Sequence, residues 1–447
     1  MNELEGDQYL NRTFDAGRPY DVVRAKFLLS KIGSGKTPRG GAEVYVDNGV
    51  LFIRSQNVHS GGLHLDDTVR IPLSVDSEML GTRVRPYDIL LNITGASLGR
   101  ASLVPIDLEP SNVNQHVCIM RPIRKAIVPA FLHYAVISDF VQSQIFSSEN
   151  GVSREGLNFE QVANMLVPYP KSLRLQQAIV VFLDGETAKI DALIAKKERL
   201  IELLDEKRMA AIGQFVTKGL NPKATMRDTQ IGWIGQVPSH WTVCRFGYRC
   251  EVQLGKMLDT SRIKGDQLYP YLRNIDVQWG RINVSDLPMM DFSHEDRQRF
   301  SLRSGDILVC EGGEIGRCAI WDGTIHECYY QKALHRVRSS QDDDPKYLFY
   351  VIQFAAKSGG FSEGANQTTI EHLPAEKFRA HRFCFPPPSE QKQIANFLDQ
   401  HLAMLNAVAR RCTESIALLK EHRIALINAA VTGKIDVREH IVEEVVA

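Results

Sequence analysis

A chain of 447 residues is long enough for about three domains, each with its own hydrophobic core. Its hydrophobic fraction of 44% and charged fraction of 24% are those of an ordinary globular protein, and no apolar run approaches the ~20 residues of a membrane helix. The formal net charge is zero, so composition by itself does not indicate a nucleic-acid partner.

The first residues and the cysteines bear on where the protein works. The acidic start MNELEGDQYL lacks the basic and apolar regions of a signal peptide. The eight cysteines include no C-x-x-C pair and match no disulfide framework. We therefore expect reduced thiols in a cytoplasmic protein, with residues 1–17 as an N-terminal extension.

Residues 18–168 are predicted to form a mixed α/β domain rich in short strands. Apolar, β-branched runs bounded by Gly, Pro and Asp predict strands at VLFIR (50–54), DILLNIT (88–94) and HVCIMRP (116–122). The spacing of apolar residues over 129–146 predicts a short amphipathic helix.

Inside this domain, KIGSGKT (31–37) is similar to the end of a phosphate-binding loop. Such a loop needs a glycine where this chain has Ser30, and a helix that starts at the lysine. Pro38 follows at once and would interrupt that helix. The pattern therefore disfavours a nucleotide site and an ATPase.

Residues 169–219 are predicted to form a long helix. Apolar residues recur every three or four positions over roughly 40 residues, which is about 60 Å of helix. So long a stripe extends beyond a domain of ~150 residues and needs another helix along it. Residues 220–240 contain turn residues without periodicity and are interpreted as a linker.

The remaining elements repeat this order. Residues 241–385 are predicted to form a second mixed domain, with a strand at GDILVCE (305–311) and a helix over 345–359. A second long helix is expected over 386–434, and residues 435–447 form a C-terminal tail.

The chain is an internal duplication. RLQQAIVVFLD (174–184) matches SEQKQIANFLD (389–399), and the register continues to the end of both helices. Gly35-Lys36 corresponds to Gly255-Lys256, where Met257 replaces the hydroxyl residue of a phosphate loop. A turn that carries a basic side chain is therefore expected in both halves.

The predicted fold class is α+β: two mixed α/β domains, each followed by a long helix, with the two helices packed as an antiparallel coiled coil and an internal pseudo-two-fold repeat. The apolar residues assigned to the helix and subunit interface are Phe182, Leu183, Ile190, Leu193, Leu204, Phe397, Leu398, Leu405, Val408 and Leu419.

Local patches carry the chemistry of DNA contact despite the zero net charge. Arg and Lys suit guanine, Asn and Gln suit adenine, and Lys, Ser and Thr suit phosphates. Five basic residues and no acid lie between Arg24 and Arg39, and polar groups stand at strand ends and in corresponding loops. The alternative is that they are solvated loop residues. The candidates are Lys31, Lys36, Thr37, Arg39, Arg54, Gln56, Asn57, Gln115, Ser153, Arg154, Lys256, Arg273, Asn274, Gln331, Gln367, Thr368 and Thr369.

Nothing in the sequence predicts catalysis by this chain. Glu311 and Glu314 have no counterparts in the first half, and His326 with Cys328 lacks a complete zinc ligand set. The stretch after Phe385 does not match the motif of adenine methyltransferases. No catalytic residue, metal or cofactor is therefore expected.

The duplicated order of variable domain and helix resembles the specificity subunit of Type I restriction–modification systems. The motifs that carry the resemblance are PPPSEQKQIANFLD (386–399) with its helix to VTGKIDV (431–437), and WIGQVPSHW (233–241). It covers nearly the whole chain, although the first helix starts differently, with YPKSLRLQQ.

That resemblance implies a function and partners. Each variable domain would read one half of a bipartite, asymmetric DNA site. The helices would separate the domains and dock two copies of an adenine-methylating modification subunit. AdoMet, and ATP with Mg, would belong to partner subunits, including the motor and endonuclease restriction subunits. The alternative is a non-catalytic helical scaffold whose two domains bind proteins.

Overall fold

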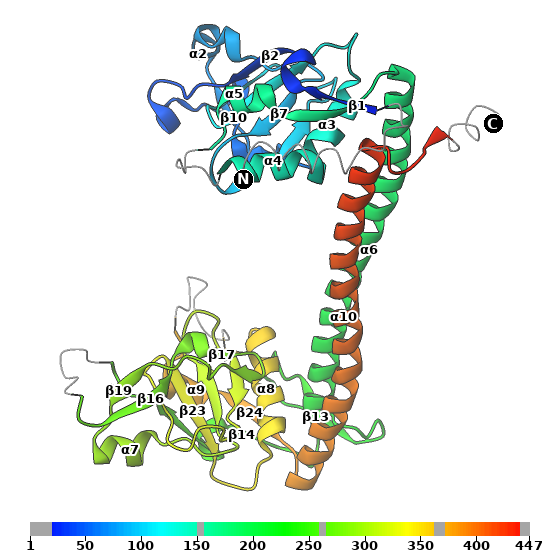
Figure 1. Ribbon diagram of the computed structural model, residues 1–447. Coiled ribbons are helices and arrows are strands. Elements are labelled where there is room, and N and C mark those ends of the chain that lie inside the picture. The colour runs from blue at the N-terminus through cyan, green and yellow to red at the C-terminus, as the bar shows by residue number, and fades with distance from the viewer. Residues whose placement is uncertain (1–19, 150–155, 259–264, 362–371, 439–447) are drawn as a thin grey trace. The chain divides into compact units, whose positions relative to one another are not determined.

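The computed structural model describes residues 20–149, 156–258, 265–361 and 372–438, and the chain divides into two compact units (Figure 1). Unit 1 comprises residues up to Lys197 and from Glu414 onward, and unit 2 comprises Glu198–Thr413. The two long helices, α6 (Leu173–Lys218) and α10 (Pro388–Val431), each contribute one part to either unit.

Unit 1 is built on a four-stranded antiparallel sheet in the order β2-β10-β7-β8. A three-stranded sheet, β6-β3-β9, pairs β3 with β9 in parallel, and β1 pairs with β11. The strands are β1 (Tyr20–Arg24), β2 (Leu29–Ser34), β3 (Val50–Ile53), β4 (Val58–His59), β5 (Gly62–Leu63), β6 (Val69–Ile71), β7 (Ile89–Asn92), β8 (Ala101–Leu103), β9 (Ser111–Val113), β10 (Val117–Pro122) and β11 (Leu166–Pro170). The short helices are α2 (Leu73–Glu78), α3 (Pro129–Ile137), α4 (Asp139–Glu149) and α5 (Phe159–Asn164).

Unit 2 repeats these sheets, with the orders β15-β23-β20-β21, β19-β16-β22 and β14-β24. β16 and β22 pair in parallel, as β3 and β9 do in unit 1. The strands are β12 (Met226–Asp228), β13 (Gln236–Pro238), β14 (Thr242–Arg245), β15 (Cys250–Leu254), β16 (Leu268–Leu272), β17 (Val277–Gln278), β18 (Arg281–Ile282), β19 (Met289–Asp291), β20 (Ile307–Cys310), β21 (Cys318–Ile320), β22 (Tyr329–Tyr330), β23 (Leu334–Ser339) and β24 (Arg382–Phe385). The short helices are α7 (His294–Phe300), α8 (Pro345–Lys357) and α9 (Ala375–Ala380). The matching topology confirms the predicted fold class and the duplication.

The central strands are apolar throughout because both faces of their sheet are buried. In β7, Ile89 and Leu91 belong to the core beneath α3, whereas Leu90 belongs to a second core against the three-stranded sheet. In β20, Ile307 and Leu308 divide between two cores in the same way. Successive side chains point to opposite faces of a strand, so a strand between two layers needs apolar residues at every position.

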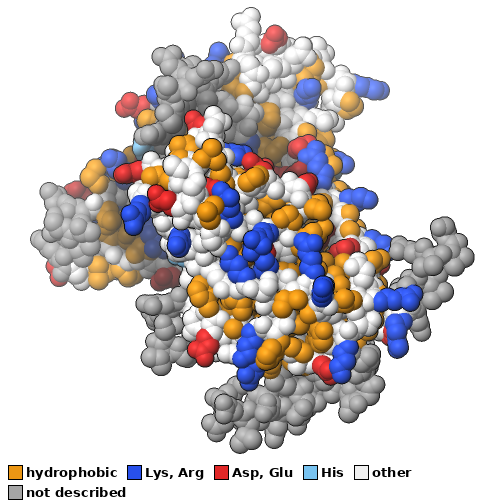
Figure 2. Space-filling model, turned by 90° about the horizontal axis from the view of Figure 1, so that it is seen from above, with side chains coloured by type: hydrophobic (Ala, Val, Ile, Leu, Met, Phe, Trp, Pro, Cys, Tyr) orange, Lys and Arg blue, Asp and Glu red, His pale blue; other side chains and the backbone are white. Residues whose placement is uncertain are grey.

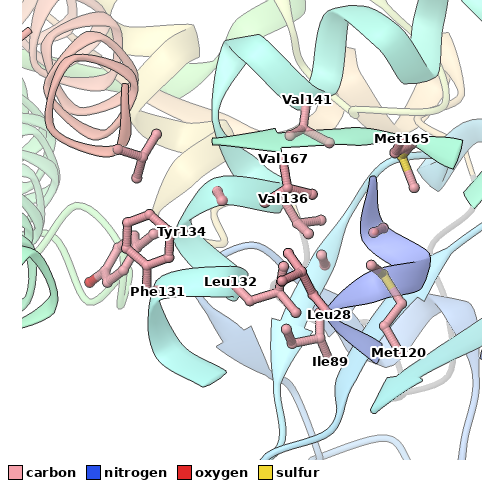
Figure 3. Close-up of a cluster of buried hydrophobic side chains, with 14 of the residues drawn as sticks. Leu28, Ile89, Met120, Phe131, Leu132, Tyr134, Val136, Val141, Met165 and Val167 are labelled. Atoms are coloured by element: carbon pink, nitrogen blue, oxygen red, sulfur yellow. The ribbon is translucent and has the colours of Figure 1, made fainter. Parts of the chain in front are cut away.

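Figure 3 shows the first of these cores. Leu132 and Val136 from α3 meet Ile89 of β7 and Met120 of β10, and the side chains are closely packed. The ring of Tyr134 lies at the edge of this cluster, and its hydroxyl donates to Asp184 of α6 at 2.6 Å. The same core therefore joins the sheet to the long helix.

Two segments differ from the sequence prediction. The helix expected over 129–146 divides into α3 and α4 at Ser138, whose hydroxyl bonds to the Ala135 carbonyl at 2.7 Å. The segment 220–240 contains the β12–β13 hairpin and is packed on unit 2 through buried Ile234 and Val237. Isolated apolar residues of this kind show no periodicity, so the sequence pattern does not reveal their burial.

The long helices pack against each other in antiparallel directions within each unit. In unit 1, the buried residues 179–183 of α6 and 427–431 of α10 share one core, and Asp191 pairs with Arg423 at 2.9 Å. In unit 2, Ile212 and Leu398 share another core. Among the described residues, no helix is both long and apolar enough to cross a membrane.

Candidate nucleic-acid interface

A glycine turn follows the central strand of the main sheet in both units. Gly95 and Gly99 follow β7 with φ of 73° and 82°, and Gly313 and Gly316 follow β20 with φ of 73° and 80°. Glycine adopts positive φ without the steric penalty of a side chain. The repeated glycines therefore serve the backbone, as the sequence suggested.

The Gly-Lys pair is a second repeated feature, and the structure explains why it persists. A Cβ on Gly35 would lie 1.7 Å from the carbonyl oxygen of Val113, and one on Gly255 would lie 2.4 Å from that of Gln331. The glycine lets the end of one strand approach the end of another. No α-helix starts at Lys36, and only a short 3-10 turn follows at Gly41–Val44, so this segment is a tight turn and not a phosphate loop.

In unit 1 a hollow of about 360 Å³ opens beside the glycine turn. Thr94 Oγ1 lies 2.6 Å from His116 Nδ1, Gln115 Nε2 lies 3.0 Å from His116 Nε2, and the Thr37 hydroxyl donates to Gln115. This network joins the loop after β2, the turn after β7 and the residues before β10. The hollow is lined by Ser55, Gln56, Thr94, Gly95, Ala96, Ser97, Arg100 and His116.

One cation of this hollow and two on the neighbouring loop after β2 are exposed. Lys36 and Arg39 are exposed on the same loop as Thr37, and Arg100 is exposed on the rim. The Arg100 guanidinium has no partner among the described residues. In the view of Figure 2, Lys and Arg side chains lie in several small groups separated by apolar and uncharged ones. A local group of cations can bind phosphates even when the net charge of the whole chain is zero.

Lys31 lies apart from that loop, on β2, and is already engaged. Its ammonium donates to the carbonyl oxygen of Gly81. Partial burial and the neighbouring Arg121 lower the pKa of Lys31. The run of basic residues from Arg24 to Arg39 therefore does not form one continuous surface.

The stretch Arg54–Asn57 forms a 3-10 turn at the end of β3, and its residues have different roles. Arg54 Nη2 donates to the Asp67 carbonyl at 2.8 Å, and the exposed Gln56 donates to the Asp67 carboxylate at 2.5 Å. Asn57 is fully buried and donates to His64 and Asp67 at 3.0 and 2.7 Å. The Asn57 amide therefore closes the turn and is not exposed to a ligand in this conformation, unlike the sequence prediction, which placed it among open polar residues.

Unit 2 has the same turn with its cations paired internally. Arg273 bonds to the Asp276 carboxylate at 2.8 Å, and Lys256 bonds to that of Asp296 at 2.6 Å. Asn274 donates to the Gly312 carbonyl at 3.1 Å and accepts from Arg317 at 2.8 Å. These residues stabilise the turn, so the structure does not leave them open as the sequence suggested. Gln331 is half-buried and bridges to Lys256 through the backbone.

Arg100, Thr94 and His116 line the hollow but were not among the candidates of the sequence analysis. Arg100 corresponds to Arg317, which bonds to the backbone and side-chain oxygens of Asn274 at 3.0 and 2.8 Å. Ser55 takes the place of Asn274 in unit 1 and has no amide oxygen. That difference leaves Arg100 open, and a comparison of the two halves at positions 55 and 274 could have indicated it.

The prediction also named residues in two polar loops, one in each unit. The candidates Ser153, Arg154, Gln367, Thr368 and Thr369 lie outside the described residues. The positions that follow these loops are buried and anchored: Leu157 N donates to the Ile93 carbonyl at 2.8 Å, and Leu373 N donates to that of Glu311 at 2.7 Å.

Glu314, one of the two carboxylates of the glycine turn in unit 2, is held by two donors. Glu314 accepts from Lys357 at 2.6 Å and from Trp279 at 2.7 Å. Burial acts to raise the pKa of Glu314, but these donors outweigh it, and the pKa is lowered. Glu314 therefore stays ionised as a structural anchor. In the described part of the chain, no group of three or more His, Cys, Asp or Glu is placed to hold a metal ion.

The predicted interface residues of the long helices divide by exposure. Leu183, Ile190 and Leu398 are buried, and four are half-buried: Phe182, Leu204, Leu405 and Leu419. Three are exposed, namely Leu193 (43%), Phe397 (38%) and Val408 (42%). The same stripe therefore packs the helices and leaves apolar side chains on their surface.

Comparisons with known proteins agree with this architecture. The family model for the Type I restriction modification DNA specificity domain matches residues 238–416. The EcoKI specificity subunit of Escherichia coli (strain K12) is 21% identical over 399 residues, which cover 87% of this chain and 83% of that protein.

Two solved structures share the fold. One, from a study of complex assembly and conformational transition of the type I R-M system, has a TM-score of 0.70 at 18% identity and covers 93% of this chain and 98% of its own. The HsdS subunit from Thermoanaerobacter tengcongensis has a TM-score of 0.51 at 18% identity, with coverage of 94% and 99%. With the duplicated topology and the matching sequence motifs, these similarities lead to one conclusion: residues 238–416 are a Type I restriction modification DNA specificity domain, and the chain as a whole is similar in sequence and fold to Type I specificity subunits.

Proposed function

We propose that this chain is the DNA sequence-recognition subunit of a Type I restriction–modification complex. Each unit reads one half of a bipartite, asymmetric site with the loops at its glycine-turn end. The observation that carries the proposal is the repeated topology, which gives each unit an equivalent strand-end surface with different side chains on it. Different side chains on equivalent surfaces suit two unlike half-sites.

The contacts expected in unit 1 come from the open hollow. Lys36, Arg39 and Arg100 are exposed cations for phosphates or guanine, and Gln56 and Gln115 have amides suited to adenine. In unit 2 the equivalent groups are already bonded within the protein; they are Lys256, Arg273 and Asn274. They can contact DNA only if these internal bonds open, or through donors and acceptors that the internal bonds leave unused. The loops that contain Arg154 and Gln367 are expected to contribute in both units.

The chain also assembles the catalytic subunits. Exposed apolar residues on α6 and α10, such as Leu193 and Val408, offer a surface for an adenine-methylating modification subunit. Because the chain is duplicated, two copies of that subunit bind. AdoMet, and ATP with Mg, bind to partner subunits. DNA cleavage is carried out by separate motor subunits. This chain is itself non-catalytic. The complex works in the cytoplasm, where the DNA is.

Exchange of one recognition domain tests the proposal. Residues 18–168 are replaced by the variable domain of a related protein, and methylated adenines are sequenced in cells that carry the complete system. We expect one half of the methylated site to change while the other half and the spacer length stay the same. If both halves change, the two domains do not read independently.

A further inference from the structure

Unit 2 contains a hollow of about 420 Å³ between the long helices and α8. Its apolar wall includes Trp279, Phe349 and Leu402, and its polar wall includes Arg208 from α6 and Asn406 from α10. In Figure 1, α8 lies between the strands of unit 2 and α10. The hollow therefore lies where the long helices pack on the domain of unit 2.

The duplication shows what is missing from this hollow. Arg208 of α6 corresponds to Arg423 of α10, and Asn406 corresponds to Asp191. In unit 1, Arg423 bonds to the Asp191 carboxylate through Nε at 2.9 Å and Nη2 at 3.2 Å. In unit 2 an amide stands where that carboxylate would be.

Arg208 is left without an equivalent partner. Its Nε is buried and has no hydrogen-bond partner among the described residues. The nearest carboxylate is that of the exposed Asp205, one turn earlier on the same helix and 3.8 Å away. A buried donor without a partner is unfavourable, so a ligand that accepts from it gains binding free energy.

The charged groups around the two arginines differ. Near Arg423 in unit 1 are two carboxylates: Asp191, which binds it, and Asp184, which accepts from Tyr134. Near Arg208 in unit 2 are the cation Lys346 and two carboxylates: Asp399, which already accepts from Lys346 and Tyr350, and the exposed Asp205. An anion in the unit 2 hollow would therefore take the place that Asp191 has in unit 1.

We propose that this hollow receives a carboxylate side chain, Asp or Glu, of the modification subunit that docks on unit 2. Arg208 donates to it, the Asn406 amide adds a second donor, and the aromatic wall packs the stem of the side chain. In unit 1 the equivalent arginine, Arg423, binds a carboxylate, and part of the wall of the unit 2 hollow is apolar, which suits a carboxylate side chain of a protein better than a phosphate chain. The inference rests on the proposed function, and it makes the two docking positions of the chain inequivalent.

The decisive variant is Asn406→Asp, which supplies the missing carboxylate from within the chain. It should reproduce the Asp191–Arg423 pair, leave thermal stability unchanged or raised, and weaken binding of one modification subunit by about tenfold, as expected for loss of a hydrogen bond to a charged group. Gln400→Glu is the matched control, because Gln400 is exposed on the same helix and the change adds the same charge. The control should bind as the parent chain does.

Arg208→Met removes the cation and should weaken binding of the same modification subunit. In the double variant with Asn406→Asp, binding should be no weaker than in either single variant, because both changes remove the same contact. Complexes are prepared by co-expression of the full chain with the modification subunit, and bound copies are counted across a titration. Unchanged affinity and copy number in both variants would overturn the inference. Weaker DNA binding with unchanged assembly would overturn it too, and would identify the anion as a DNA phosphate. If the parent chain binds no modification subunit, the proposed function itself fails.

Discussion

Single side chains distinguish two surfaces that share one backbone. Arg100 and Arg317 follow equivalent glycine turns, but only Arg317 has an asparagine to bind, so only Arg100 remains open. Asn57 and Asp276 occupy the same buried position in the 3-10 turn, and the carboxylate of Asp276 also neutralises Arg273. The residue at the position of Ser55 or Asn274, and that at the position of Asn57 or Asp276, therefore decide whether the neighbouring arginine is bonded within its own unit.

Arg100→Ala should weaken binding of the assembled complex to its methylated site by about 1–3 kcal/mol if the guanidinium contacts a base edge. If the guanidinium contacts a phosphate instead, the variant should reduce the slope of log K against log salt concentration by about 1. The control is Lys125→Ala, because Lys125 is exposed beyond the opposite end of β10. Equal affinity and salt dependence for Arg100→Ala and the parent complex would exclude Arg100 from the interface.

His133 predicts an acid-sensitive unit 1. Burial, with a smaller contribution from the nearby Arg423, lowers the pKa of His133 from 6.5 to about 4, although a bond to the Ala101 carbonyl acts to raise it. Between these two pH values only the unfolded chain takes up the proton, so the free energy of unfolding falls as pH falls through this window.

The expected loss is about 1–2 kcal/mol between pH 7 and pH 4.5, and His133→Gln should remove it. Denaturant unfolding at a series of pH values measures this effect. A variant as acid-sensitive as the parent chain would show that other groups cause the loss.

At the scale of elements, the identities that repeat between the long helices attach each helix to its own domain. The Gln176 amide accepts from Val128 N at 2.7 Å and donates to the Pro170 carbonyl at 2.8 Å. Gln391 makes the equivalent bonds in unit 2, at 2.9 Å each. Asp184 and Asp399 likewise accept from a tyrosine of α3 or α8. The repeat therefore preserves the junction between helix and sheet domain.

Gln176→Leu should lower the free energy of unfolding by about 2–4 kcal/mol, because it leaves a buried N–H and a buried carbonyl without partners. The adjacent residue gives a matched control: Gln177 is exposed, and Gln177→Leu should change stability by less than about 0.5 kcal/mol. Denaturant unfolding of the full chain compares the two. Equal effects would mean that the amide contacts of Gln176 do not stabilise the junction.

For the whole molecule, α6 is important because it passes from unit 1 to unit 2 without a break over 46 residues. A continuous helix transmits length and rotation from one end to the other. If it separates the two reading domains, its length sets the number of base pairs between the half-sites. This dependence belongs to the assembled chain and to neither unit alone.

Insertion of four residues at Lys197 adds about 6 Å of helix and turns the following residues by about 40° relative to a whole turn. DNA rises about 3.4 Å per base pair, so we expect the half-sites to persist and the spacer to lengthen by one or two base pairs. Sequencing of methylated adenines measures the spacer. Methylation at the original spacer by a folded complex would show that docking on the modification subunits sets the distance.

The sequence alone determined the duplication, the strand runs, the two long helices and the family resemblance, because periodicity and repeated motifs are local properties of the chain. It also identified the Gly-Lys turn, since a comparison of the halves excluded a phosphate loop. Only the tertiary structure decided which polar residues are open. Asn57 is buried, Lys256 is paired with Asp296, and Arg100 is free of partners among the described residues. Each of these outcomes depends on contacts between segments distant in sequence, and such contacts leave no periodic signal.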